Sequence, residues 1–131
     1  MTLALSVRQP WASLILLAGK DIENRTWKTM VRGPILIHAA KGMTGREYIE
    51  AMAFATFATC ILDPRRRDDL EPGHLPRGGI IGSVNLVDCV YQSDSPWFQG
   101  PYGFALRNPK PLPFVPFKGQ LGFFDVPGVQ P

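Results

Sequence analysis

SVRQPWASLILLAGKDIENRTWKTMVR, from Ser6 to Arg32, joins an apolar helical segment to the densest mixture of charges in the chain. The short apolar run Leu3–Val7 precedes it and is typical of a buried strand. Pro10 suits the first turn of a helix, where its missing N–H costs nothing. One face of that helix is apolar, because helical spacing relates Trp11, Leu14, Ile15 and Ala18. Gly19 supplies a left-handed stop at its end.

The residues after this helix combine both charge signs with an aromatic ring in a strand-like pattern. The pattern predicts a strand over Ile22–Thr29, in which alternate side chains share a face. Glu23, Arg25 and Trp27 then lie on one face of the strand. Lys20 stands next to them at the end of the helix. We interpret this segment as one wall of a binding pocket.

The remainder of the chain predicts one longer helix and several short strands. Thr44 and Glu47 have the spacing of a capping box, which begins a helix that runs to about Ile61. Asp63–Gly78 is charged, contains three prolines and is predicted to be an exposed loop. Asn108–Pro116 holds four prolines and is predicted to be extended or turning. Strands are expected over Ile35–Ala40, Gly79–Tyr91, Tyr102–Arg107 and Gly119–Val126.

Strands outnumber helices and do not alternate with them in a regular βαβ order. This pattern favours the α+β class, as a small, mostly antiparallel β-barrel with two helices at its rim. Gly79 and Gly82 indicate a bulge or a close backbone approach near the start of the longest strand. A length of 131 residues predicts a single domain, residues 1–131.

The composition narrows the classes of function. The net charge of +3 suits phosphate or carboxylate ligands but falls short of the strongly cationic surfaces of long-duplex binders. The N-terminus lacks the features of a signal peptide, and the longest apolar run, Trp11–Ala18, is too short to cross a membrane. The protein is therefore predicted to be cytoplasmic, without membrane association.

Candidate metal ligands are scattered through the sequence. Cys60, Cys89, His38 and His74 lack the spacing of zinc ligands, so the sequence predicts neither a metal site nor a cofactor. His38 lies in an apolar strand, where it is either a hydrogen-bonded structural residue or part of a cleft. In the run Arg65–Asp69 (RRRDD) three arginines are followed at once by two aspartates, and this self-neutralising charge favours a solvated loop over a nucleic-acid patch.

An ordered set of short motifs covers nearly the whole chain. The motifs are Gln9-Pro10-Trp11-Ala12, Gly19–Trp27, Arg32-Gly33-Pro34, Ile37-His38-Ala39, Gly79–Gly82, Val87-Asp88-Cys89, Tyr102–Leu106 and Gly119–Gly122. Together they resemble the ASCH domain, a branch of the PUA-like superfamily of small β-barrels. The resemblance implies a PUA-like barrel that binds RNA or a modified nucleobase in a cleft between barrel and helices. In ASCH members the segment Gly-Lys-x-x-Glu-x-Arg, here Gly19 to Arg25, marks that cleft.

The same resemblance implies an enzymatic alternative. Some small bacterial members are amidohydrolases that deacetylate acetylcytidine, and others are associated with ribonuclease activity. In the amidohydrolases the lysine is followed three positions later by a threonine nucleophile, and a distant glutamate assists. Lys20 matches the lysine, but Glu23 stands at the threonine position. A carboxylate cannot replace that hydroxyl in the same mechanism, so fold and cleft carry over and the mechanism does not.

Two function hypotheses follow. As a binding module, the protein would hold single-stranded RNA or a nucleoside, with phosphate contacts from Lys20, Arg25, Lys28 and Arg32. Glu23 would accept hydrogen bonds from a base edge, and Trp27 or Trp97 would stack on its face, Trp97 as an exposed lid. The predicted ligand-binding set also includes Gln9, Trp11 and His38. As a hydrolase, the protein would use Lys20 and Glu23 as a catalytic acid–base pair.

Each residue also has a structural interpretation. Lys20 can cap the preceding helix as a cation, and Glu23 and Arg25 can form an ion pair on the sheet face. Trp11 and Trp27 can belong to the core. A third hypothesis is that the cleft binds a protein partner. From the sequence, binder and enzyme, and RNA and DNA, remain alternatives.

Overall fold

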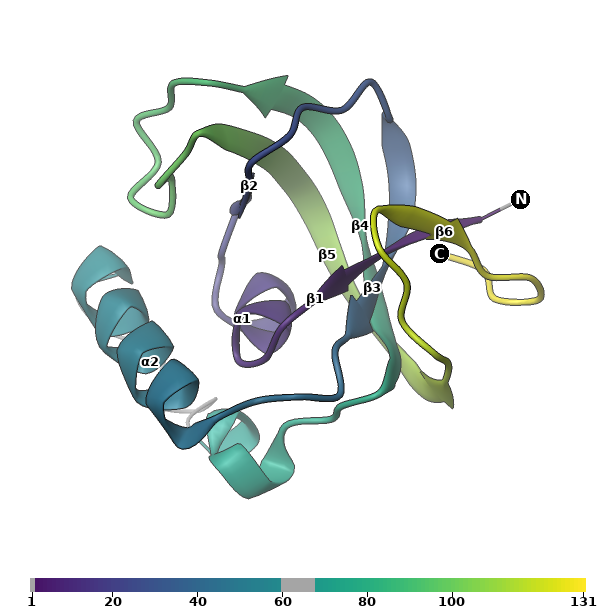
Figure 1. Cartoon of the computed structure of the whole chain (residues 1–131), viewed down its shortest axis with the longest axis horizontal. Helices are drawn as coiled ribbons and strands as arrows, with labels where there is room; N and C mark the ends of the chain where they lie inside the picture. Colours follow the sequence, from purple (N-terminus) through teal and green to yellow (C-terminus); the bar gives the residue numbers. More distant parts are fainter. Residues whose placement is uncertain (1, 60–67) are drawn as a thin grey trace.

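The computed structural model describes residues 2–59 and 68–131. Within them one mixed sheet curls around a short helix, and a longer helix stands at its open side (Figure 1). The strands are β1 (Leu3–Val7), β2 (Ile22–Arg25), β3 (Gly33–Ala39), β4 (Gly79–Val90), β5 (Tyr102–Pro116) and β6 (Phe123–Asp125), and the helices are α1 (Trp11–Leu17) and α2 (Gly45–Thr59). No helix in the described ranges is long and apolar enough to cross a membrane.

The strand order is β2-β5-β4-β3-β1-β6. β1 and β3 run parallel, and the other neighbouring strands are antiparallel. Helix α1 packs on the concave side of the curled sheet, against β3, β4 and β5 (Figure 1). The predicted fold, a small α+β barrel with mostly antiparallel strands and two helices, is confirmed.

Two glycines of β4 allow α1 and β5 to lie close to the strand. A Cβ atom on Gly82 would lie 2.6 Å from Leu16 of α1, and one on Gly79 would lie 2.5 Å from the Val115 carbonyl oxygen. The β4–β5 register also shifts between Ile80 and Gly82. The predicted close approach is confirmed, and its consequence is a tightly curled sheet with α1 inside it.

Some of the predicted helix and strand boundaries agree with the structure, and others differ from it. The capping box forms as predicted, because Thr44 Oγ1 accepts a hydrogen bond from the Glu47 amide at 3.1 Å and Glu47 Oε1 accepts one from the Thr44 amide at 3.0 Å. β2 ends at Arg25, four residues before the predicted end at Thr29. β5 continues through the proline-rich segment, because β2 pairs only with residues 102–105 and the prolines need no partner on that side.

Part of the region predicted to be an exposed loop is buried. Two single-turn helices, η2 (Asp68–Leu70) and η3 (Pro72–His74), bring Leu70 and Leu75 into the core. The predicted end of α2 at Ile61, as well as Cys60 and Arg65–Arg67, lies outside the described residues.

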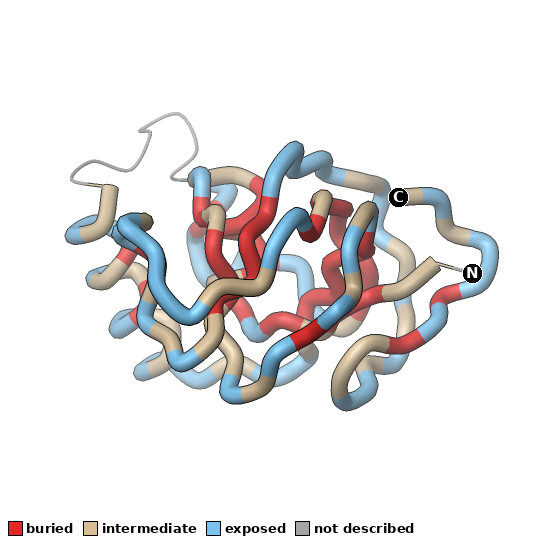
Figure 2. Tube along the Cα trace, turned by 90° about the horizontal axis from the view of Figure 1, so that it is seen from above, coloured by how far each residue is buried: buried red, intermediate tan, exposed pale blue. Residues whose placement is uncertain are grey.

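The prediction that Trp97 is an exposed lid is wrong. Its side chain is 3% exposed and packs in a cluster with Leu14 of α1 and Ile22 of β2, and its ring lies 6.1 Å from that of Phe54 in α2. Figure 2 shows the buried stretches gathered in the middle of the molecule, with exposed loops around them. Trp97 therefore joins α2 to the body of the barrel.

Candidate functional site

Lys20, Glu23 and Arg25 meet in one buried cluster. Glu23 Oε1 accepts a hydrogen bond from Lys20 Nζ at 2.8 Å, and Glu23 Oε2 lies 3.1 Å from Arg25 Nε and 3.0 Å from Arg25 Nη2. Glu23 and Arg25 share a face because alternate residues of β2 point the same way. Gly19, with a φ of 77°, turns the chain out of α1 and brings Lys20 beside them.

The cluster is tied to three elements of the fold. Lys20 is 3% exposed, donates a hydrogen bond to the Ile22 carbonyl, and lies 5.5 Å from the ring centroid of Trp11. Arg25 Nη2 donates to the Ser6 carbonyl of β1 at 2.8 Å. The ammonium of Lys20 is thus bound to β2, and does not cap α1. Both cations hold the Glu23 carboxylate in one orientation.

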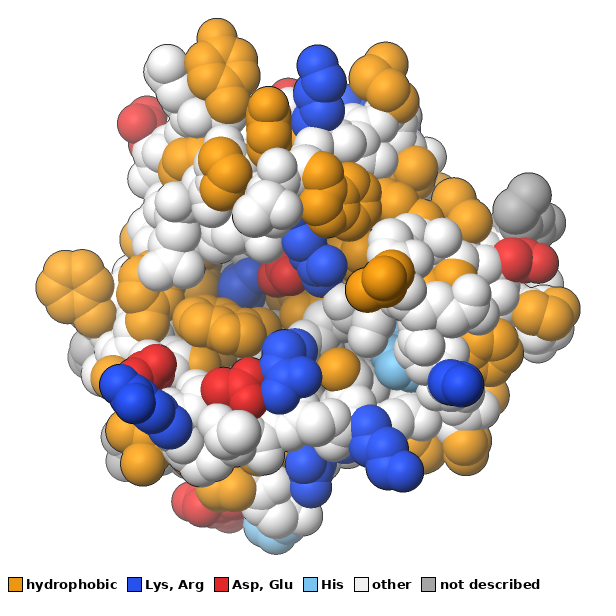
Figure 3. Space-filling view, viewed as in Figure 1, with side chains coloured by type: hydrophobic (Ala, Val, Ile, Leu, Met, Phe, Trp, Pro, Cys, Tyr) orange, Lys and Arg blue, Asp and Glu red, His pale blue; other side chains and the backbone are white. Residues whose placement is uncertain are grey.

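A narrow cleft opens onto this cluster. A cavity of about 420 Å³ is lined by Trp11, Glu23, Arg25 and Trp27, among others, and a smaller one of about 160 Å³ reaches Lys20. Trp27 is half-buried and packs edge-on against Phe104, with ring centroids 5.2 Å apart. Figure 3 shows this hollow near the middle of the face, with charged side chains at its bottom and apolar ones around it.

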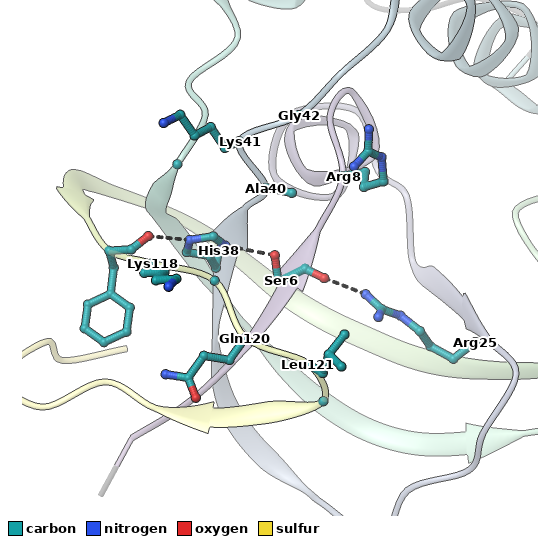
Figure 4. A pocket seen from close by; sticks show the side chains of 14 residues that line it. Ser6, Arg8, Arg25, His38, Ala40, Lys41, Gly42, Lys118, Gln120 and Leu121 are labelled. Carbon is teal, nitrogen blue, oxygen red and sulfur yellow. Dashed lines mark hydrogen bonds between the residues drawn. The ribbon is translucent and has the colours of Figure 1, made fainter.

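A wider cavity of about 860 Å³ adjoins the cleft and shares Ser6, Arg8 and Arg25 with it. Lys41 and Lys118 also line it, and its described lining contains no carboxylate (Figure 4). These side chains come from segments far apart in the sequence. Because the wide cavity shares residues with the cleft and its charged lining is cationic, we describe it as a positively charged groove that continues the cleft.

His38 supports the wall of this groove. Its ring is 1% exposed, with Nδ1 2.9 Å from Ser6 Oγ and Nε2 2.7 Å from the Phe117 carbonyl oxygen. Because a carbonyl only accepts, Nε2 donates to Phe117, and the Ser6 hydroxyl, which can donate or accept, pairs with Nδ1. Figure 4 shows this row of hydrogen bonds continuing from Ser6 to Arg25. His38 is thus a hydrogen-bonded structural residue, and it also lines the groove.

Arg8 is held at the junction of cleft and groove by Glu47 of α2. The pair is bidentate, with Nε–Oε2 at 2.6 Å and Nη2–Oε1 at 2.7 Å. Hydrogen bonding from Arg8, together with that from the Thr44 backbone, lowers the pKa of Glu47 to about 2. The same hydrogen bond raises the pKa of Arg8. The capping box of α2 thereby also positions a cation of the site.

Four of the predicted ligand-binding residues lie outside both the cleft and the groove. Gln9 is fully buried, and its amide bonds to Ser13 and to the Pro76 carbonyl. Trp97 lies in the core, and Lys28 and Arg32 line a separate pocket. Sequence reasoning missed Arg8, Lys41 and Lys118 as groove residues, because no local motif relates them.

Comparison with known proteins identifies the family of this chain. The ASCH domain profile matches residues 5–110, which include the whole Gly19–Arg25 segment. The human protein Activating signal cointegrator 1 is 34% identical over 125 residues, covering 88% of this chain and 20% of the human protein. The mouse protein of the same name is 34% identical over 88 residues, covering 67% of this chain and 14% of the mouse protein. The chain thus spans a fifth or less of the length of these relatives, and it belongs to the ASCH domain family.

Proposed function

We propose that this ASCH domain binds single-stranded RNA, with one base in the cleft and the adjoining phosphates in the groove. The observation that carries the proposal is the continuity of two cavities of different chemistry. The cleft offers a buried carboxylate between Trp11 and Trp27, and the groove offers four cations without a carboxylate in its described lining. Bases and phosphates need these two environments side by side.

The cleft suits a base that carries an exocyclic amine. Glu23 Oε1 accepts one hydrogen bond, from Lys20, and so retains capacity to accept another. A carboxylate accepts from the amino group of a base, and the indole rings of Trp11 and Trp27 offer faces for stacking. Lys20 and Arg25 contribute by holding Glu23 in place, so the carboxylate needs little reorganisation when the base enters.

The groove favours an oligonucleotide over a free nucleoside. Arg8, Arg25, Lys41 and Lys118 line it, and each phosphate that they neutralise releases counterions from the nucleic acid. A nucleoside carries no phosphate and would leave Lys41 and Lys118, which form no ion pair with a carboxylate of the described residues, without an anionic partner. Single-stranded RNA presents unstacked bases next to its phosphates, which is the usual basis of RNA recognition.

Fluorescence anisotropy with a labelled, mixed-sequence RNA tests the proposal. Lys41 and Lys118 are exposed, so Lys41→Ala and Lys118→Ala should leave the fold intact. Each should weaken binding and reduce the slope of log K against log salt by about 0.7, the value for one phosphate of a single strand. Lys110→Ala, an exposed cation of β5 outside the groove, is the matched control. Absence of RNA binding by the wild type at low salt would contradict the proposal. Measuring the affinity for single-stranded DNA of the same sequence shows whether the protein prefers RNA to DNA.

A hydrolase is the second candidate, favoured by the 2.8 Å contact between Lys20 Nζ and Glu23 Oε1. A carboxylate in this position can act as a general base toward water. The test is product formation beyond one equivalent from acetylcytidine or from RNA, with loss of that turnover in Glu23→Gln. The variant is assayed under conditions in which circular dichroism shows that it is folded. Turnover that depends on Glu23 would establish that the protein is a hydrolase. If the wild type shows no turnover, the hydrolase hypothesis is rejected and RNA binding without catalysis is retained.

A further inference from the structure

We propose that a second pocket, lined by residues that follow Trp27 in the chain, binds a further nucleotide of the same strand. The inference rests on the proposed RNA binding and adds a separate stacking site to it. The pocket has a volume of about 500 Å³, and the residues that define its chemistry are Lys28, Arg32, Tyr91 and Tyr102.

The second pocket adjoins the cleft along two short segments. Trp27 lines the cleft, and the next residue, Lys28, lines the second pocket. Likewise, Gly100 lines the cleft and Pro101 lines the second pocket. Tyr102 pairs with Arg25 in the β2–β5 ladder, so the two pockets meet across one pair of strands. The second pocket is therefore the neighbour of the cleft along these segments, which is why we assign it to the next nucleotide of the strand.

The cations of this pocket are placed to receive a phosphate. Arg32 Nη1 donates to the carbonyls of Thr29 at 3.0 Å and Val31 at 2.8 Å, which orients the guanidinium. Its Nη2 lies 3.7 Å from Asp88, a longer contact that leaves donors free. Lys28 is exposed, and no carboxylate of the described residues forms an ion pair with it.

The aromatic side chains offer a face for a base. Tyr91, just after β4, is 74% exposed, and Tyr102 is partly buried beside it in the same pocket. An exposed ring next to two cations is the arrangement with which proteins bind single-stranded nucleic acid without reading its sequence. We therefore assign this pocket to a base that is held by stacking and to its phosphate.

The test compares a labelled dinucleotide with an RNA of about ten nucleotides, by anisotropy. Tyr91→Ala should weaken binding of the longer RNA by about fivefold or more, the lower end of measured base-stacking effects, and should leave the dinucleotide unaffected. Tyr91→Phe should bind as the wild type does, because the ring is retained. Lys28→Ala should reduce the salt slope by about 0.7 for the longer RNA only. Phe114→Ala removes an exposed ring outside the pocket and is the control.

The outcomes separate this inference from the proposed function. If Tyr91→Ala and Lys28→Ala bind the longer RNA normally while Lys118→Ala does not, the second pocket is refuted and the groove stands. Equal weakening of both RNAs by Tyr91→Ala would also refute it, because the effect would then come from the cleft or the fold. If the wild type binds neither RNA, both proposals fail.

Discussion

Loss of the Glu23 charge should destabilise the fold more than loss of its lysine partner. Lys20 is 3% exposed, and in Glu23→Gln its ammonium would keep the Ile22 carbonyl and the Trp11 ring but no counter-charge. Breaking a buried ion pair in this way costs about 3–5 kcal/mol. In Lys20→Met, Glu23 keeps both contacts with Arg25, so the expected cost is about 1.5–3 kcal/mol, that of one charged hydrogen bond.

Urea unfolding, followed by tryptophan fluorescence and by circular dichroism, measures these costs. The double variant Lys20→Met/Glu23→Gln no longer buries an unpaired ammonium, and Arg25 keeps its hydrogen bond to the Ser6 carbonyl. The double variant should therefore be more stable than the sum of the single changes predicts, by at least about 1 kcal/mol. Arg46→Met, which breaks an exposed pair with Glu50, is a control with an expected cost below about 0.5 kcal/mol.

Two results would refute this reasoning. A cost below about 1 kcal/mol for Glu23→Gln would mean that the Lys20 ammonium reaches water or another counter-charge in solution. Additive costs in the double variant would mean that the two side chains do not interact. In either case the cluster would not hold Glu23 in a fixed orientation, and the argument for a prepared base site would be lost.

Three further predictions follow from the site and its supports. Glu47, whose pKa is about 2 through its bond to Arg8, stabilises the fold above pH 4.5 and loses that effect as the pH falls through about 2. The urea midpoints of wild type and Glu47→Gln should therefore differ most above pH 4.5 and converge toward pH 2. Gly119→Ala places a Cβ 2.8 Å from His38 Cε1, so it should cost about 1–3 kcal/mol in urea unfolding and weaken RNA binding through the displaced groove wall. Trp97→Ala should cost about 3–5 kcal/mol yet leave RNA affinity of the folded protein unchanged, whereas a lid would show the reverse.

The centre of the site could be predicted because its residues are close in sequence. A strand with period two places Glu23 and Arg25 on one face, and a helix that ends at a left-handed glycine brings Lys20 next to them. These are local consequences of backbone geometry. The capping box of α2 was predictable for the same reason, since Thr44 and Glu47 satisfy each other within one helical turn.

The errors concern residues whose surroundings come from distant segments. Trp97 stands between loop residues and was expected to be exposed, but α1, β2 and α2 close over it. Lys28 and Arg32 follow the strand that lines the cleft, yet the chain leaves the sheet after Arg25 and carries them into another pocket. Neither outcome can be derived from local spacing.

Local patterns in the sequence were enough to predict the class of fold, the family resemblance and the charged centre of the cleft, because periodicity and turn chemistry act within a few residues. The shape and extent of the site depend instead on contacts between distant segments. The curl of the sheet brings Arg8, Lys41 and Lys118 to one groove, and His38 fixes its wall through hydrogen bonds to Ser6 and Phe117. These residues become neighbours through the pairing of strands that are distant in sequence. Spacing and periodicity within one segment cannot predict which distant segment it will contact.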